Sequence, residues 1–211
     1  FLLLLTVAVI MLEDLTRYGT SERIEKIKVM LDKRQPDLTV VLENVHDEHN
    51  VSAVLRSCDA VGVMEVCLVY YGGQKFPKLN EKTSASGRKW VRQRHFTSVD
   101  ECYDYLRSRG RKVYSTGINS QSVSLFSMEL TESVALVFGN EHKGVSAEAI
   151  AKADGNFIIP QVGMIQSLNI SVACAVTLYE AYRQREVAGM YDTSRITESE
   201  QHALIKQWLT E

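Results

Sequence analysis

Three loops of this 211-residue chain carry polar side chains directly after apolar runs typical of strands. These side chains are Asn50 and Arg56 around the first loop, Glu141 in the second, and Ser167 and Asn169 in the third. In an open parallel sheet the ligand lies beyond the carboxyl ends of the strands, so such loops decide the function. Backbone N–H and C=O groups at a turn like the one before Ser167 suit an adenine edge or a carboxylate. Helix capping by Ser167 or Asn169 is the alternative for this loop. The pattern indicates a ligand cleft that Arg56 and Glu141 can reach.

The same loops exclude two common nucleotide sites. The first loop, residues 43–50, has no glycine and so cannot be a G-x-G-x-x-G loop. Its sequence argues against a dinucleotide-binding unit and equally against the common Rossmann-type methyltransferases. Gly139 and Gly144 have the spacing of a phosphate-binding loop, but the following Val145 lacks the required lysine. What remains is a strand end where backbone approaches a ligand closely. A tight turn with a solvated Glu141 is the alternative.

Histidine and cysteine usage argues against a metal centre. His46 and His49 lie beside two acids, but their spacing is not that of H-E-x-x-H and no third ligand presents itself. The four cysteines form no C-x-x-C pair, so we expect them to be free thiols that pack as small apolar side chains in the core. Such cysteine usage is typical of a protein in the reducing cytoplasm.

Positive charge is local. The net charge is −2, so no global field attracts nucleic acid, yet residues 82–112 carry nine cations against three acids. Trp90 and His95 are interleaved with these cations and could stack on bases. The segment predicts an RNA-binding patch, and a solvated helix face explains part of it. The residues we expect to bind RNA are Arg88, Lys89, Arg92 and Arg94.

Helical and strand patterns alternate from Ser21 onward, which predicts one α/β domain with a mostly parallel sheet flanked by helices. We expect helices at 21–34 (capped by Ser21 and stopped by Pro36), 49–62, 99–110, 167–186 and 196–209 (with a Thr197–Glu200 capping box), and strands at 38–45, 65–71, 91–96 and ending near 117, 139 and 161.

Taken together, the three loops resemble the three motifs of the SpoU-type (SPOUT superfamily) RNA ribose 2′-O-methyltransferases. The matches are N-x(5)-R at Asn50 and Arg56, G-x-E at Gly139 and Glu141, and P-x-x-G-x-x-x-S-L-N-x-S at Pro160, Gly163, Ser167, Leu168, Asn169 and Ser171. The resemblance covers residues 20–190. The segments at 33–40, 178–186 and 188–191 are most similar to members that methylate guanosine 18 of tRNA.

The resemblance implies a C-terminal deep trefoil knot within about 134–186 and an obligate homodimer whose catalytic residues cross the interface. It implies S-adenosyl-L-methionine as methyl donor without a metal, and tRNA as partner without a membrane. The positions whose backbone would hold the donor are Thr116, Gly139, Ile159 and Leu168.

The resemblance also implies roles for the polar side chains in methylating the ribose 2′-hydroxyl of guanosine 18 in the tRNA D-loop. A guanidinium group is a poor general base, because its pKa exceeds ~12. We therefore expect Arg56 to organise the phosphate and the 2′-oxygen. Asn50, Glu141, Ser167 and Asn169 would position the RNA and Arg56. Methylation of another tRNA or rRNA position is one alternative, and a non-catalytic RNA-binding protein on the same fold is another.

Domain boundaries follow from composition and from the resemblance. Residues 1–10 are apolar except Thr6, and even with the two apolar residues that follow the run is short of the ~20 residues needed to cross a bilayer. We interpret them as a non-native or upstream extension. The methyltransferase domain is expected at 11–190 and a helical tail at 191–211.

Overall fold

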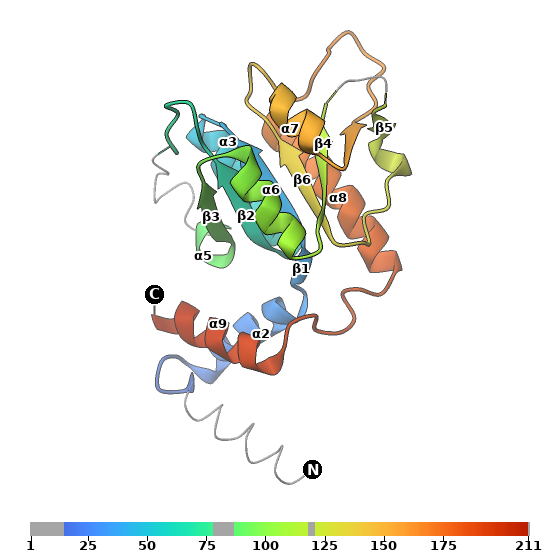
Figure 1. The fold of residues 1–211 in the computed structure, drawn as a ribbon. Helices are drawn as coiled ribbons and strands as arrows, with labels where there is room; N and C mark the ends of the chain where they lie inside the picture. Colours follow the sequence, from blue (N-terminus) through green and yellow to red (C-terminus); the bar gives the residue numbers. More distant parts are fainter. Residues whose placement is uncertain (1–14, 78–86, 118–120, 211) are drawn as a thin grey trace. The chain divides into compact units, whose positions relative to one another are not determined.

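The computed structural model describes residues 15–77, 87–117 and 121–210 (Figure 1). The chain forms two compact units: one comprises residues 35–188, and the other joins the residues before 35 to those after 188. The extension predicted at residues 1–10 lies outside the described residues. Every predicted site residue belongs to the larger unit.

A parallel sheet is the centre of the larger unit. Within the described residues it has seven strands in the order β3-β2-β1-β6-β4-β7-β5, and each neighbouring pair is parallel. The strands are β1 (Gln35–Glu43), β2 (Val63–Val69), β3 (Arg92–Phe96), β4 (Lys112–Thr116), β5 (Val123–Ser124), β6 (Val134–Phe138) and β7 (Gly155–Ile158). The predicted mostly parallel sheet flanked by helices is confirmed.

Strand β1 is an interior strand of this sheet, between β2 and β6, and is buried on both faces. Val40 and Leu42 belong to a core that includes residues of α3 and α8, whereas Val41 belongs to a second core with residues of α6 and α7. Figure 1 shows α6 in front of the sheet and α8 behind it. The helical elements of this unit are α3 (Glu48–Ala60), α5 (Gly87–Trp90), α6 (Val99–Ser108), the 3-10 turn η1 (Leu125–Ser127), α7 (Ala147–Lys152) and α8 (Ile170–Val187).

Four of these helices begin where a loop side chain caps them. Asp47 caps α3, Ser98 caps α6, Ser146 caps α7 and Asn169 caps α8, each accepting a hydrogen bond from a backbone N–H in the first turn. The Asn169 cap explains why α8 begins three residues later than its apolar pattern predicts. Each cap comes directly from a loop at the carboxyl edge of the sheet, so helix starts and candidate site residues share the same segments.

Short elements and one proline depart from the predictions. α5 and β5 were not predicted because four and two residues are too few to show a periodicity. Pro36, expected to stop the first helix, is instead the second residue of β1. The register of β1 against β2 is irregular between Gln35 and Thr39. Pro36 lies in this interval and has no backbone N–H to donate to a neighbouring strand, which explains the irregularity.

The smaller unit contains α2 (Ser21–Asp32) and α9 (Glu198–Thr210). Thr20, not the predicted Ser21, caps α2, since its hydroxyl accepts from the N–H of Arg23. The predicted capping box of α9 is confirmed: the Thr197 N–H donates to the Glu200 carboxylate, and the Glu200 N–H donates to the Thr197 hydroxyl.

The four cysteines are buried and free, as predicted. In the part of the chain that the structure describes, no helix is both long and apolar enough to cross a membrane.

Candidate active site

Three predicted side chains from three separate loops form one hydrogen-bonded network. The Asn50 amide, in the first turn of α3, donates to Glu141 Oε1 over 3.1 Å. The Asn169 amide, at the cap of α8, donates to Asn50 Oδ1, also over 3.1 Å. Asn50 is 8% exposed, whereas Glu141 and Asn169 are exposed. The network therefore fixes the buried amide and leaves carboxylate and amide atoms available to a ligand.

A cavity of about 890 Å³ lies beside this network, within the size range of small-molecule sites. All four residues predicted to hold the donor line it, together with three of the five predicted catalytic residues: Thr116, Gly139, Ile159 and Leu168, with Glu141, Ser167 and Asn169. Apolar side chains from the strands and α8, such as Phe138 and Ala173, complete the wall. The structure thus brings the second and third motifs together around one space.

The loop after β6 closes on itself so tightly that glycine is required. A Cβ at Gly139 would lie 2.1 Å from backbone atoms of Gly144 and Val145. Asn140 and Gly144 exchange two backbone hydrogen bonds of 3.0 and 2.8 Å, and Gly144 has a φ of 68°. The glycine spacing noted in the sequence therefore serves the turn itself.

Asn140 is a further residue of this loop that the sequence analysis missed. Its Oδ1 accepts from the N–H groups of His142 and Lys143, and its amide donates to the Asn44 carbonyl over 2.9 Å. An asparagine between two motif residues was the available signal, because asparagine side chains commonly bond backbone groups in turns.

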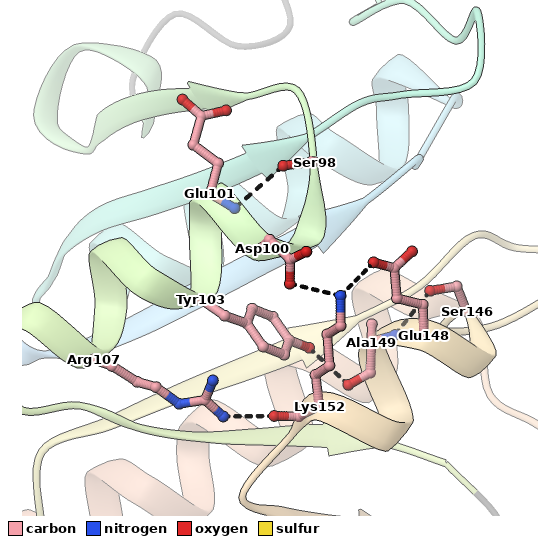
Figure 2. Close-up of polar contacts among 9 residues, drawn as sticks. All are labelled: Ser98, Asp100, Glu101, Tyr103, Arg107, Ser146, Glu148, Ala149 and Lys152. Atoms are coloured by element: carbon pink, nitrogen blue, oxygen red, sulfur yellow. Dashed lines mark hydrogen bonds and ion pairs between the residues drawn. The ribbon is translucent and has the colours of Figure 1, made fainter.

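Helix α6 holds α7, which directly follows the glycine turn (Figure 2). Lys152 Nζ donates to Asp100 over 2.6 Å and to Glu148 over 2.7 Å, and the Tyr103 hydroxyl donates to the Ala149 carbonyl over 3.1 Å. Burial raises the pKa of Tyr103, so its hydroxyl stays a donor. α6 thereby fixes one wall of the cavity.

A second buried tyrosine lies near the network. The Tyr70 hydroxyl donates to the Val45 carbonyl, and burial, followed by the charge of Glu141, raises the pKa of Tyr70. Tyr70 therefore remains protonated. Among the described residues, no three His, Cys, Asp or Glu side chains are placed to share a metal ion.

Arg56 is not part of the network in its own chain. It is exposed on α3 and does not line the cavity, and its side chain makes no hydrogen bond or ion pair with the described residues. α5 packs beside it: a Cβ at Gly87 would lie 2.9 Å from the Arg56 nitrogen. The structure thus places the backbone of Arg56 against the start of α5, the helix that carries Arg88 and Lys89, two of the predicted RNA-binding residues.

The other two predicted RNA-binding residues, on β3, lie on the opposite face of the sheet. Arg94 Nε pairs with Glu65 over 3.2 Å, and its guanidinium lies 4.6 Å from the ring centroid of Tyr105 on α6. Arg92 shares this face by strand alternation. The four candidates therefore form two surfaces, with Arg94 held by protein partners and Arg88 and Arg92 exposed.

The comparison with known families identifies the class of protein to which this fold and cavity belong. The sequence profile of the SpoU rRNA Methylase family matches residues 37–179, and the chain belongs to that family. The resemblance inferred from the three motifs is confirmed.

Individual relatives are similar over most of the chain. The tRNA (guanosine(18)-2′-O)-methyltransferase of Thermus thermophilus is 46% identical over 193 residues, covering 92% of this chain and 98% of the relative. The protein of the same name from Escherichia coli is 40% identical, covering 87% and 80%. The crystal structure of the TrmH/SpoU tRNA modifying enzyme of A. aeolicus matches with a TM-score of 0.83 at 38% identity, covering 89% and 95%.

Proposed function

We propose that this protein transfers a methyl group from S-adenosyl-L-methionine to the ribose 2′-hydroxyl of guanosine 18 in the D-loop of tRNA. The observation that carries the proposal is the Asn50–Glu141–Asn169 network, two members of which line the cavity. The relatives from T. thermophilus and E. coli, named for this reaction, support the choice of nucleotide.

The residues around the cavity suit the proposed donor. Its apolar wall fits an adenosine, and the backbone of Thr116, Gly139, Ile159 and Leu168 would hold the polar edges of the molecule. When bound, the sulfonium supplies an electrophilic methyl group. The tight turn at Gly139 presents backbone to the cavity where a side chain would fill the space.

The protein's part in the reaction is to align a weak nucleophile with this methyl group. Glu141, Asn169 and Ser167 line the cavity, and Asn50 fixes the first two, so these four residues would orient the ribose. Arg56 would bind the neighbouring phosphate and stabilise negative charge on the 2′-oxygen.

The exposed position of Arg56 supports a homodimer in which a second copy presents this residue to the cavity. The first half of α8 carries apolar side chains on more than one side: Cys174 and Leu178 are buried, yet Val172 is 47% and Tyr179 is 55% exposed. Exposed apolar side chains that gather on one helix face mark a surface for a partner. A second copy of the chain packed on α8 would bury this face.

The family also supports two structural proposals. The first is a deep trefoil knot within about 134–186, the segment that runs from β6 through α7 and β7 to α8. The second is a methyltransferase domain at 11–190, which would contain the compact unit 35–188, followed by a tail at 191–211 that contains α9.

The surface formed by Arg56 and α5 would bind the tRNA backbone. Replacing Arg88 and Lys89 together by alanine should weaken tRNA binding and lower the slope of log affinity against log salt by up to about two. Filter binding over a salt series measures this slope. Lys112→Ala, an exposed cation at the start of β4, is the matched control and should leave it unchanged.

Radiolabelled methyl transfer to unmodified tRNA tests the proposed reaction. We expect transfer by the wild type, none to tRNA with 2′-deoxyguanosine at position 18, and a loss of about 10²-fold or more for Arg56→Ala. Transfer that survives the deoxy substitution would mean methylation of a base or of another nucleotide. Transfer to an rRNA fragment but not to tRNA would favour the ribosomal target, and tRNA binding without transfer would favour a non-catalytic RNA-binding protein.

A further inference from the structure

We propose that Glu43 and Asn44, at the carboxyl end of β1, are positioning residues that hold the glycine turn of residues 139–146 in its binding geometry. Neither residue belongs to the three motifs. The identity of the ligand in this inference rests on the proposed function, whereas the positioning of the turn does not.

Glu43 holds the far end of the turn. It is only 3% exposed, and its Oε2 accepts the backbone N–H of Ser146 over 2.8 Å. Its Oε1 accepts the hydroxyl of Tyr71, and this bond, after burial, raises the pKa of Tyr71. Because Ser146 is the cap of α7, the carboxylate fixes the point where the turn becomes helix.

Asn44 holds the near end. Its carbonyl accepts the amide of Asn140 over 2.9 Å, and its own Oδ1 accepts the N–H of Tyr71 over 3.2 Å. Among the described residues it is the one non-glycine residue with positive φ, at 50°. Such a conformation costs free energy and persists where the surroundings require it. Here it turns the Asn44 carbonyl toward Asn140.

Asn50 holds the middle of the turn at Glu141, and Glu43 and Asn44 add contacts at its two ends. The internal bonds of the turn, between Asn140 and Gly144, fix its shape but not its position. Glu43 and Asn44 supply one bond at each end from an interior strand that is buried on both faces. A buried carboxylate is tolerated only where hydrogen-bond donors surround it. For Glu43 these donors are the Ser146 N–H and the Tyr71 hydroxyl.

A second buried carboxylate offers a matched control. Glu65 on β2 is 6% exposed and accepts from the Tyr105 hydroxyl over 2.7 Å, so it repeats the Glu–Tyr pair of Glu43 and Tyr71. It contacts Arg94 and lies near Arg111, but it makes no hydrogen bond to residues of the turn. Its removal should destabilise the protein without moving the turn.

The experiment compares Glu43→Ala, Glu43→Gln and Glu65→Ala by calorimetric titration with S-adenosyl-L-methionine, at a temperature where all are folded. Glu43→Ala leaves the partly buried N–H of Ser146 without its acceptor, so the dissociation constant for S-adenosyl-L-methionine should rise about tenfold. Glu43→Gln should restore most of the affinity, because its amide can accept from Ser146 and donate to Tyr71. Glu65→Ala should bind like the wild type.

Hydrogen exchange of the ligand-free proteins tests the positioning itself. The amides of residues 139–146 should exchange faster than in the wild type in Glu43→Ala and in Asn44→Ala. Asn44→Ala loses the contact of the Asn44 side chain to the Tyr71 N–H. In Glu65→Ala these amides should exchange at the wild-type rate. Equal exchange and equal donor affinity in Glu43→Ala and wild type would overturn the inference, as would an equal loss in Glu65→Ala. If the wild type binds no donor while exchange still responds only to Glu43 and Asn44, the proposed function fails and the positioning role stands.

Discussion

The two edges of the parallel sheet use polar residues in opposite ways. At the amino edge Arg185 is fully buried, and its guanidinium donates to Asp37 over 2.6 Å, to Gln35 over 3.0 Å and to two backbone carbonyls. At the carboxyl edge Glu141 is exposed, with Asn50 as its side-chain partner in the described structure.

The difference separates stability from chemistry. Four of the five N–H donors of the buried Arg185 bond protein acceptors, so Arg185 fastens the end of α8 to the start of β1 and to residues 130–132. The carboxyl edge instead leaves oxygen and amide atoms beside a cavity, where a parallel sheet places its ligand. Substitutions at the two edges should therefore affect different measurements.

The largest effect is expected at the amino edge. Arg185→Ala should lower the free energy of unfolding by about 3–5 kcal/mol, because it removes the hydrogen bonds that a fully buried guanidinium donates to Asp37 and to two backbone carbonyls. Arg183, two residues earlier on α8 with a side chain 63% exposed, is the matched control. Its alanine variant should lose at most about 1 kcal/mol. Urea denaturation measures both, and equal losses would contradict the distinction.

At the carboxyl edge we expect a smaller effect, which is confined to catalysis and leaves stability nearly unchanged. Glu141→Gln should lower kcat by about 10²-fold with little change in the thermal midpoint, because the exposed carboxylate orients groups rather than supporting the core. Single-turnover methyl transfer and a thermal melt on the same sample check both statements. A large fall in the midpoint with unchanged kcat would reverse the assignment.

The smallest effect is expected for an exposed pair at the amino edge. Lys112 and Glu132 lie 2.6 Å apart, with side chains 56% and 48% exposed. Glu132→Gln should change the free energy of unfolding by less than about 1 kcal/mol and leave kcat unaltered. This variant is thus the control for Glu141→Gln, and a loss of activity in it would show that the edges are not separate.

The sequence predicted the sheet and the gathering of the motifs because both depend on local patterns. Apolar runs such as 134–138 are buried on both faces in any parallel sheet, and the loops after them must meet at one edge. This geometry predicts that the side chains of Asn50, Glu141 and Asn169 lie close together. The structure confirms it with two hydrogen bonds among them.

Other features depend on partners far away in the chain and could not be predicted. Arg185 lies in a helix with nothing to distinguish it from Arg183, and only the folded chain shows that its partners are residues 35–37 and 130–132. Glu43 was interpreted as part of a loop without glycine, and its role depends on Ser146, about a hundred residues later. The position of Arg56 beside α5 depends on a four-residue helix too short to predict.

The most direct test of the account is calorimetric titration of wild type and Gly139→Ala with S-adenosyl-L-methionine. The added Cβ would meet backbone at 2.1 Å, so the turn must move and the cavity must change shape. The account predicts saturable heat for the wild type at one donor per chain and none for a folded Gly139→Ala variant that still binds tRNA. No heat from the wild type, or the same affinity in both proteins, would contradict it.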